Sequence, residues 1–124
     1  LLAAIESGVV HCIGHPTGRL IGKRDPVSFD VKTVFAACAE HDVALEINAQ
    51  PDRMDLPDTF CQDAAHAGAK CVIATDAHKT GDFDFMTQGV SVARRGWLRK
   101  KNVLNTLPTT RFLKAIQRRA HAHR

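Results

Sequence analysis

Three short apolar runs alternate with amphipathic segments along this chain of 124 residues. Residues 9–13, 43–47 and 70–75 are rich in β-branched and small residues, which is typical of buried strands. The segments that follow them have apolar residues at helical spacing. Because strands and helices that alternate at this spacing are typical of a parallel sheet with right-handed crossovers, the sequence predicts an α/β fold of about three β/α units.

Capping residues mark where the helices of this pattern begin and end. Asp30 is suited to cap a helix over 31–41, and a helix over 57–67 is expected to begin at Pro57 and to end before Gly68. The remaining predicted helices are the end of one at 1–7, one over 84–95, a short one over 100–105 and a terminal one over 109–120.

Asp76 and His78 directly follow the predicted strand over 70–75. Residues i and i+2 of a strand point the same way, so both side chains are expected at its carboxyl end, where α/β proteins place their chemistry. A carboxylate and an imidazole there make half of a metal site. The alternative is that Thr75 or Asp76 caps the next helix and that His78 lies in a solvated loop.

A second histidine, His15, follows the predicted strand over 9–13 in the stretch Gly14-His15-Pro16-Thr17-Gly18-Arg19. Pro16 biases His15 towards extended geometry, and the flanking glycines allow a tight loop close to a ligand. Arg19 is then a candidate phosphate-binding residue. The alternatives are a loop histidine bonded to backbone and a solvated arginine.

Glu46 and Asn48 share one face of the strand over 43–47, opposite Leu45 and Ile47. Two polar groups near the strand's carboxyl end are suited to hydrogen-bond to metal ligands and so to orient them. A buried polar pair satisfied by backbone is an equal alternative.

Charge is unevenly distributed. Residues 1–93 hold 7 basic and 13 acidic side chains, whereas residues 94–124 hold 10 basic side chains and no acid. An acidic excess favours a site that gathers cations, and a basic tail favours phosphate-rich partners such as DNA. In the tail, Arg111, Lys114 and Arg118 are predicted on one helix face, opposite the apolar residues Phe112, Leu113 and Ile116, with Trp97 available to stack or pack. A solvated helix that only aids solubility is the alternative.

The length fits one domain with a modest core, and no apolar run approaches a membrane span. The four cysteines lack C-x-x-C spacing and are interpreted as buried thiols of a reducing compartment, with disulfides or zinc ligands as the less favoured alternative. We therefore expect a cytoplasmic protein.

The motifs G-H-P-T-G-R, L-E-I-N-A, T-D-A-H, A-R-R-G-W-L and V-L-N-T resemble the last third of a PHP (polymerase and histidinol phosphatase) domain. The last two resemble in particular the PHP domain at the C-terminus of bacterial and archaeal X-family DNA polymerases. The resemblance covers residues 1 to about 119. It implies the C-terminal portion of a distorted seven-stranded, TIM-like β/α barrel with a three-metal cluster at the strand ends, followed by a basic helical tail at about 100–120.

Carried over by motif, the resemblance implies that His15, Asp76 and His78 are metal ligands, for Mn²⁺ or Zn²⁺. Arg53 matches a stretch of the polymerase-associated group and would meet phosphate; a surface ion pair with Asp52 or Asp55 is as well supported. Lys79 stands where the family has a small residue. No H-x-H pair precedes His15, and the chain begins at Leu1 within an expected helix, so we interpret it as a fragment.

The implied activity is metal-dependent phosphoester hydrolysis in the intact parent, with the 3′ end of DNA as substrate. Because only three ligands are present, we expect little activity from the chain alone. Two alternatives stay open: a phosphatase of a small phosphorylated metabolite, as in the histidinol-phosphatase branch, and a non-catalytic remnant that supports a polymerase. The implied partners are DNA, the preceding part of the barrel and a polymerase module of the same chain, with no membrane.

Overall fold

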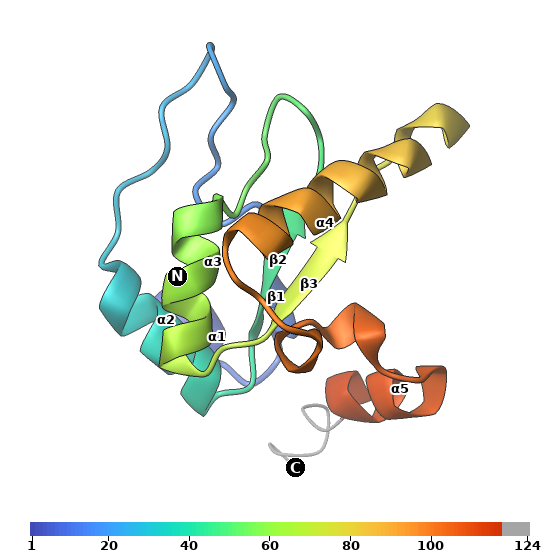
Figure 1. Cartoon of the computed structure of the whole chain (residues 1–124). Coiled ribbons are helices and arrows are strands. Elements are labelled where there is room, and N and C mark those ends of the chain that lie inside the picture. Colours follow the sequence, from blue (N-terminus) through green and yellow to red (C-terminus); the bar gives the residue numbers. More distant parts are fainter. Residues whose placement is uncertain (118–124) are drawn as a thin grey trace.

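A computed structural model describes residues 1–117 and shows an α/β arrangement (Figure 1). Its sheet has three parallel strands in the order β1 (Cys12–Ile13), β2 (Ala44–Asn48) and β3 (Cys71–Ala74). The predicted parallel α/β fold is therefore confirmed, and a closed barrel is not part of what residues 1–117 show.

The first strand is shorter than the predicted 9–13. It pairs with β2 only through Cys12 and Ile13, since β2 begins at Ala44 and the carbonyl of His11 accepts from the N–H of Ala44. Val9 is 73% exposed. The length of β1 is thus set by the start of its neighbour rather than by its own apolar residues.

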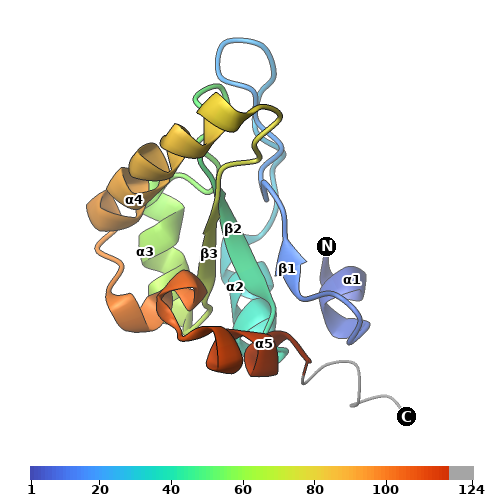
Figure 2. The same cartoon turned by 90° about the vertical axis from the view of Figure 1, so that its right-hand side faces the viewer.

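Three helices, α2 (Val31–Glu40), α3 (Asp58–Ala67) and α4 (Met86–Arg95), cover one face of the sheet (Figure 2). The carboxylate of Asp30 accepts from the N–H of Thr33 at 3.1 Å, which confirms the predicted cap of α2. Gly68 ends α3 in the left-handed conformation, as predicted.

The strands present different residues to their two faces. Leu45, Ile47 and Ile73 point to the helices and are buried, whereas Glu46 and its neighbour Val72 face the other side and are half-buried. The less covered face of the sheet therefore carries Glu46.

Close packing of α4 on the sheet depends on Gly89. A Cβ atom at this position would lie 2.5 Å from Cγ2 of Ile73 and 3.0 Å from Cβ of Ala49. The missing side chain lets the helix approach the carboxyl ends of β2 and β3.

Two predicted helices differ from the structure. The one over 84–95 is preceded by a 3₁₀ segment, η1 (Thr80–Phe85), and the one over 100–105 is two 3₁₀ turns, η2 (Lys100–Asn102) and η3 (Leu104–Thr106). The second helix is interrupted because Val103 takes an extended conformation and pairs with Cys71 of β3.

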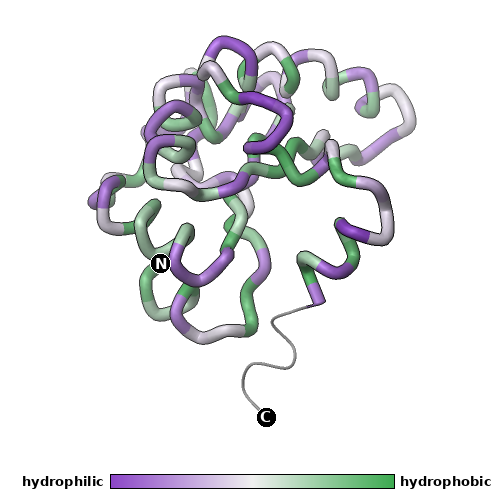
Figure 3. Tube along the Cα trace, turned by 60° about the horizontal axis from the view of Figure 1, so that its bottom comes forward, coloured by the Kyte–Doolittle hydropathy of each residue, from purple (hydrophilic) through white to green (hydrophobic). Residues whose placement is uncertain are grey.

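The chain ends of the described part are helical. They are α1 (Leu2–Glu6) and α5 (Thr109–Gln117). Figure 3 shows hydrophilic and hydrophobic residues following one another along α5. Arg111 and Lys114 are exposed as predicted, but Leu113 is also 44% exposed, so the apolar face is only partly covered. Arg118 lies outside the described residues.

The cysteines are free thiols, as expected. Cys38, Cys61 and Cys71 are buried and Cys12 is half-buried. Burial raises the pKa of Cys12 and of Cys71 to about 12, so both thiols stay protonated at neutral pH. Within the described part of the chain, no helix has the length and apolar character needed to cross a membrane.

Asn105 covers the outer edge of β3. Its side-chain oxygen accepts from the N–H of Ile73 at 2.8 Å, and its amide donates to the carbonyl of Ile73 at 2.8 Å. One side chain thus satisfies both backbone groups of an edge residue, as a neighbouring strand would.

We expect Asn105→Ala to destabilise the chain by about 1–3 kcal/mol, because the buried N–H of Ile73 loses its acceptor. Asn105→Asp keeps an acceptor for that N–H but places a carboxylate oxygen against the carbonyl of Ile73, so it should also destabilise the chain. Urea unfolding followed by circular dichroism measures both. Equal midpoints for wild type and Asn105→Ala would show that the contact contributes nothing.

Candidate functional site

The loops that follow β1, β2 and β3 meet at the carboxyl end of the sheet (Figures 1 and 2). These loops carry His15, Arg53 and the pair Asp76 and His78. Parallel strands bring their carboxyl ends to the same edge, so residues far apart in sequence become neighbours here.

Asn48 joins the two carboxylates of this edge. Its side-chain nitrogen donates to Oδ2 of Asp76 at 3.1 Å and lies 3.4 Å from Oε2 of Glu46. The backbone N–H of His15 donates to the same Oε2 of Glu46 at 2.5 Å. The predicted grouping of Glu46 and Asn48 on one face is confirmed, and the pair is satisfied largely by groups of the neighbouring strand ends.

Both His15 and Asp76 have left-handed backbone conformations, with φ of 27° and 51°. The extended geometry predicted for His15 from the following proline is therefore wrong. Residues other than glycine adopt this region only where the surroundings hold them, and such residues gather at functional sites. At His15 the Glu46 carboxylate provides part of this hold.

The side chain of Gln50 fixes the backbone at Asp76 by hydrogen bonds. Its amide nitrogen donates to the carbonyls of Thr75, at 3.0 Å, and of Asp76, at 2.7 Å, while its own N–H donates to Oδ1 of Asn48. This role of Gln50 could not be predicted from sequence, because a glutamine two residues past a strand carries no signal of which carbonyls it will reach.

His78 is oriented by backbone. Its Nδ1 lies 2.7 Å from the carbonyl oxygen of Asp76, and its N–H donates to Oδ2 of the buried Asp82 at 3.0 Å. Because a carbonyl only accepts, Nδ1 carries the proton and Nε2 keeps its lone pair in neutral His78. Metal-bound histidines commonly have this arrangement. Neither Thr75 nor Asp76 caps the next helix, since Lys79 stands at that position.

The two arginines proposed for phosphate contact tie the first two loops together. Arg19 is half-buried and donates through Nε to the carbonyl of Arg53 at 2.7 Å and through Nη2 to that of Met54 at 2.5 Å. Arg53 in turn reaches the carbonyl of Arg19 at 3.5 Å. Arg19 is therefore not a solvated charge, and any phosphate contact would use its remaining N–H groups.

Asp55 has a structural role that the sequence did not reveal. Its carboxylate is fully buried and accepts from the N–H of Thr17, at 3.1 Å, and from its hydroxyl, at 2.9 Å. Arg53 forms no ion pair with Asp52 or Asp55 in the described residues, where Arg95 and Asp58 make the one salt bridge. The bond between Thr17 and Asp55 fixes the loop that presents His15.

The donor groups fit a divalent cation in type. Glu46, Asp76, His15 and His78 lie at or after strand ends on one edge of the sheet, and mixed nitrogen and oxygen donors suit Mn²⁺ or Zn²⁺. In residues 1–117 no three histidine, cysteine or acidic side chains form a group ready to hold a metal ion. The assignment of His15, Asp76 and His78 as metal ligands stays a prediction.

Comparison with known proteins adds a direct finding. No protein-family model matches the chain. A curated protein does. Over 105 residues the chain is 42% identical to DNA polymerase/3′-5′ exonuclease PolX of Bacillus subtilis (strain 168), a match that covers 85% of this chain and 18% of PolX. The chain thus spans less than a fifth of this relative, which its name describes as both a polymerase and an exonuclease.

Proposed function

We propose that this chain is part of a metal-dependent phosphoesterase, the 3′-5′ exonuclease module of a PolX-like DNA polymerase. The observation that carries the proposal is the 42% identity to PolX together with the polar cluster at the carboxyl end of the sheet. In this proposal the three parallel strands are the C-terminal portion of a PHP barrel. The preceding strands and a polymerase module belong to the same parent chain.

The sheet supports a barrel portion because its helices lie on one face. The opposite face, with Glu46 and Val72, is half-buried and would point to the barrel interior. The other strands of a barrel would complete this face and supply the further metal ligands.

Mn²⁺ or Zn²⁺ bound here would lower the pKa of a coordinated water and balance the charge of a phosphate. The residues of the chain supply orientation. Asn48 holds the Asp76 carboxylate, and the carbonyl of Asp76 sets the His78 ring with Nε2 free. Arg19 and Arg53 are placed on the neighbouring loops, where their remaining N–H groups would meet phosphate oxygens.

The proposal is tested by the products that a full-length parent releases with Mn²⁺. We expect mononucleotides from DNA labelled at its 3′ end and little hydrolysis of histidinol phosphate. The chain of 124 residues alone is expected to release few nucleotides, because it holds only part of the ligand set.

Two other results would replace the proposal. Faster hydrolysis of histidinol phosphate than of DNA would indicate a phosphatase of small metabolites. Absence of both activities, with nucleotide incorporation intact, would indicate a non-catalytic domain that supports the polymerase.

A further inference from the structure

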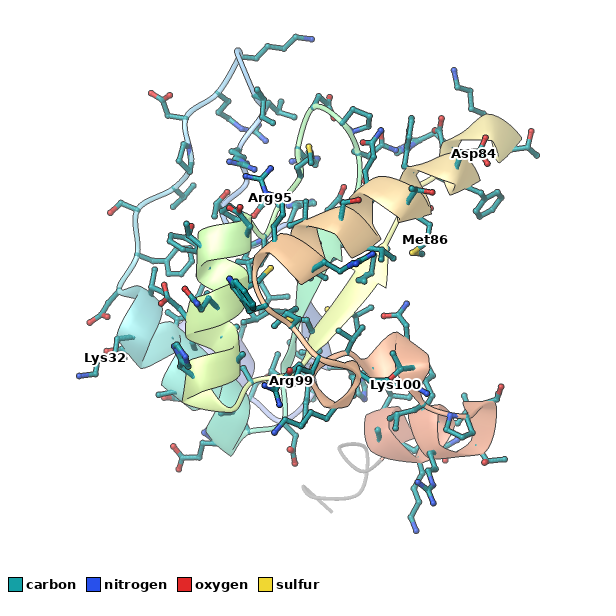
Figure 4. All side chains as sticks on the ribbon, viewed as in Figure 1. Lys32, Asp84, Met86, Arg95, Arg99 and Lys100 are labelled. Carbon is teal, nitrogen blue, oxygen red and sulfur yellow. The ribbon has the colours of Figure 1, made fainter. Side chains whose placement is uncertain are left out.

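A second charged region lies at the opposite end of the sheet from the candidate site. An open hollow of about 490 Å³ is lined there by Lys70, Lys100, Lys101 and Arg111, together with apolar residues that include Leu107 and Pro108. All four cations are exposed, and no acidic residue lines the hollow. They come from three parts of the chain: the start of β3, η2 and α5. Figure 4 shows Lys100 next to α5.

None of these four cations is neutralised within residues 1–117. Arg95 and Asp58 form the one salt bridge there, between the last residue of α4 and the first residue of α3. Residues 94–124 contain no acid that could pair with them. Four unpaired positive charges around one hollow repel one another, and a bound polyanion would relieve that repulsion.

The backbone around the hollow is held by specific bonds. Lys70 donates through Nζ to the carbonyl of Lys101 at 3.0 Å, which joins the start of β3 to η2. The hydroxyl of Thr106 lies 2.8 Å from the carbonyl of Lys100, and buried Val103 pairs with Cys71. The cations are thus presented by an ordered turn rather than by a free tail.

The two ends of the sheet differ in charge. Lys70 precedes β3, whereas Asp76 follows it, so the basic hollow and the acidic cluster are separated by the length of the strand. A polyanion could therefore bind at the hollow while the candidate metal site at the carboxyl end of the sheet stays free.

We propose that this basic hollow is a docking surface for the sugar-phosphate backbone of DNA. The inference rests on the proposed function for the kind of nucleic acid, and it adds a contact outside the hydrolytic site. Binding here is electrostatic, independent of base sequence and independent of divalent metal, and it would hold the parent on DNA while the 3′ end reaches the carboxyl end of the sheet.

The test is binding of the chain to a fluorescent 20-base-pair duplex in EDTA, measured over a range of salt concentrations. Lys100→Gln/Arg111→Gln should lower the affinity roughly tenfold or more and reduce the slope of log K against log salt by about 2, because two phosphate contacts are lost. EDTA removes the divalent metal that the proposed hydrolysis requires, so this assay measures binding alone. A failure of docking is therefore distinguished from a failure of the proposed nuclease activity.

Lys23→Gln/Lys32→Gln is the matched control, since it removes the same charge from exposed positions in the loop after β1 and on α2, both outside the basic tail. Lys32 lies far from Lys100 (Figure 4). We expect its slope to stay close to that of the wild type, with unchanged circular dichroism for both variants. An equal loss in the two double variants, or tighter binding to phosphatidylserine vesicles than to DNA, would overturn the proposal.

Discussion

Asp76→Ala in a full-length parent is expected to abolish Mn²⁺-dependent removal of 3′ nucleotides and to leave nucleotide incorporation intact. Asp76 is the acceptor of the Asn48 amide and stands beside His78 at the end of β3. Loss of its carboxylate removes a predicted ligand, and loss of a residue that merely orients a ligand already costs 10–100-fold. We therefore expect a decrease of at least roughly a hundredfold.

The measurement is release of mononucleotides from DNA labelled at its 3′ end, alongside primer extension by the same preparation. Asp84→Ala is the control, because Asp84 is an exposed acid on nearby η1 and its loss changes the charge equally (Figure 4). Asp84→Ala should retain both activities. Undiminished nucleotide release by Asp76→Ala would place the chemistry elsewhere in the parent.

Gly96→Ala is expected to destabilise the chain by about 1–3 kcal/mol, the usual cost of overpacking. A Cβ at Gly96 would lie 2.5 Å from Cβ of Cys61 and 2.6 Å from the carbonyl oxygen of Asp58. Gly96 has φ −81°, so alanine is not excluded by backbone conformation. The effect is steric: the end of α4 and the first turn of α3 would have to separate, and the ion pair between Arg95 and Asp58 lies at the same contact.

Gly81→Ala is the matched control, since a Cβ at Gly81 meets nothing within 4 Å. Gly81→Ala should be neutral or slightly stabilising, because alanine lowers the conformational entropy of the unfolded chain relative to glycine. Urea midpoints of the two variants and the wild type provide the comparison. If Gly96→Ala unfolded at the wild-type midpoint, the close contact between α3 and α4 would not be a constraint on this position.

Several features of the fold follow from short stretches of sequence. The parallel sheet, the Asp30 cap and the Gly68 end were predicted, because strand–helix alternation and capping residues are carried by short stretches of the chain. The same holds for the placement of Asp76 just past β3, since a buried run followed by a polar turn defines a strand end. Periodicity and capping act locally, so they can be read from sequence.

Other features were decided by the tertiary structure. Asp55 is buried against Thr17, 38 positions away in the sequence. The guanidinium of Arg19 donates hydrogen bonds to the carbonyls of Arg53 and Met54. Charged residues in polar loops are expected on the surface from sequence alone. These loops approach one another only after parallel strands align their ends, and that approach supplies the partners that make burial of the charges favourable.

The same division applies to the candidate site and the sheet edge. The sequence predicted His15, Asp76 and His78 as metal ligands, because imidazole and carboxylate side chains that follow strand ends suit a metal site. It did not indicate that Gln50 would hold the carbonyl of Asp76 or that Asn105 would cover Ile73. An amide side chain bonds whichever backbone groups the fold leaves without a strand partner, so its role is determined only when the chain is folded.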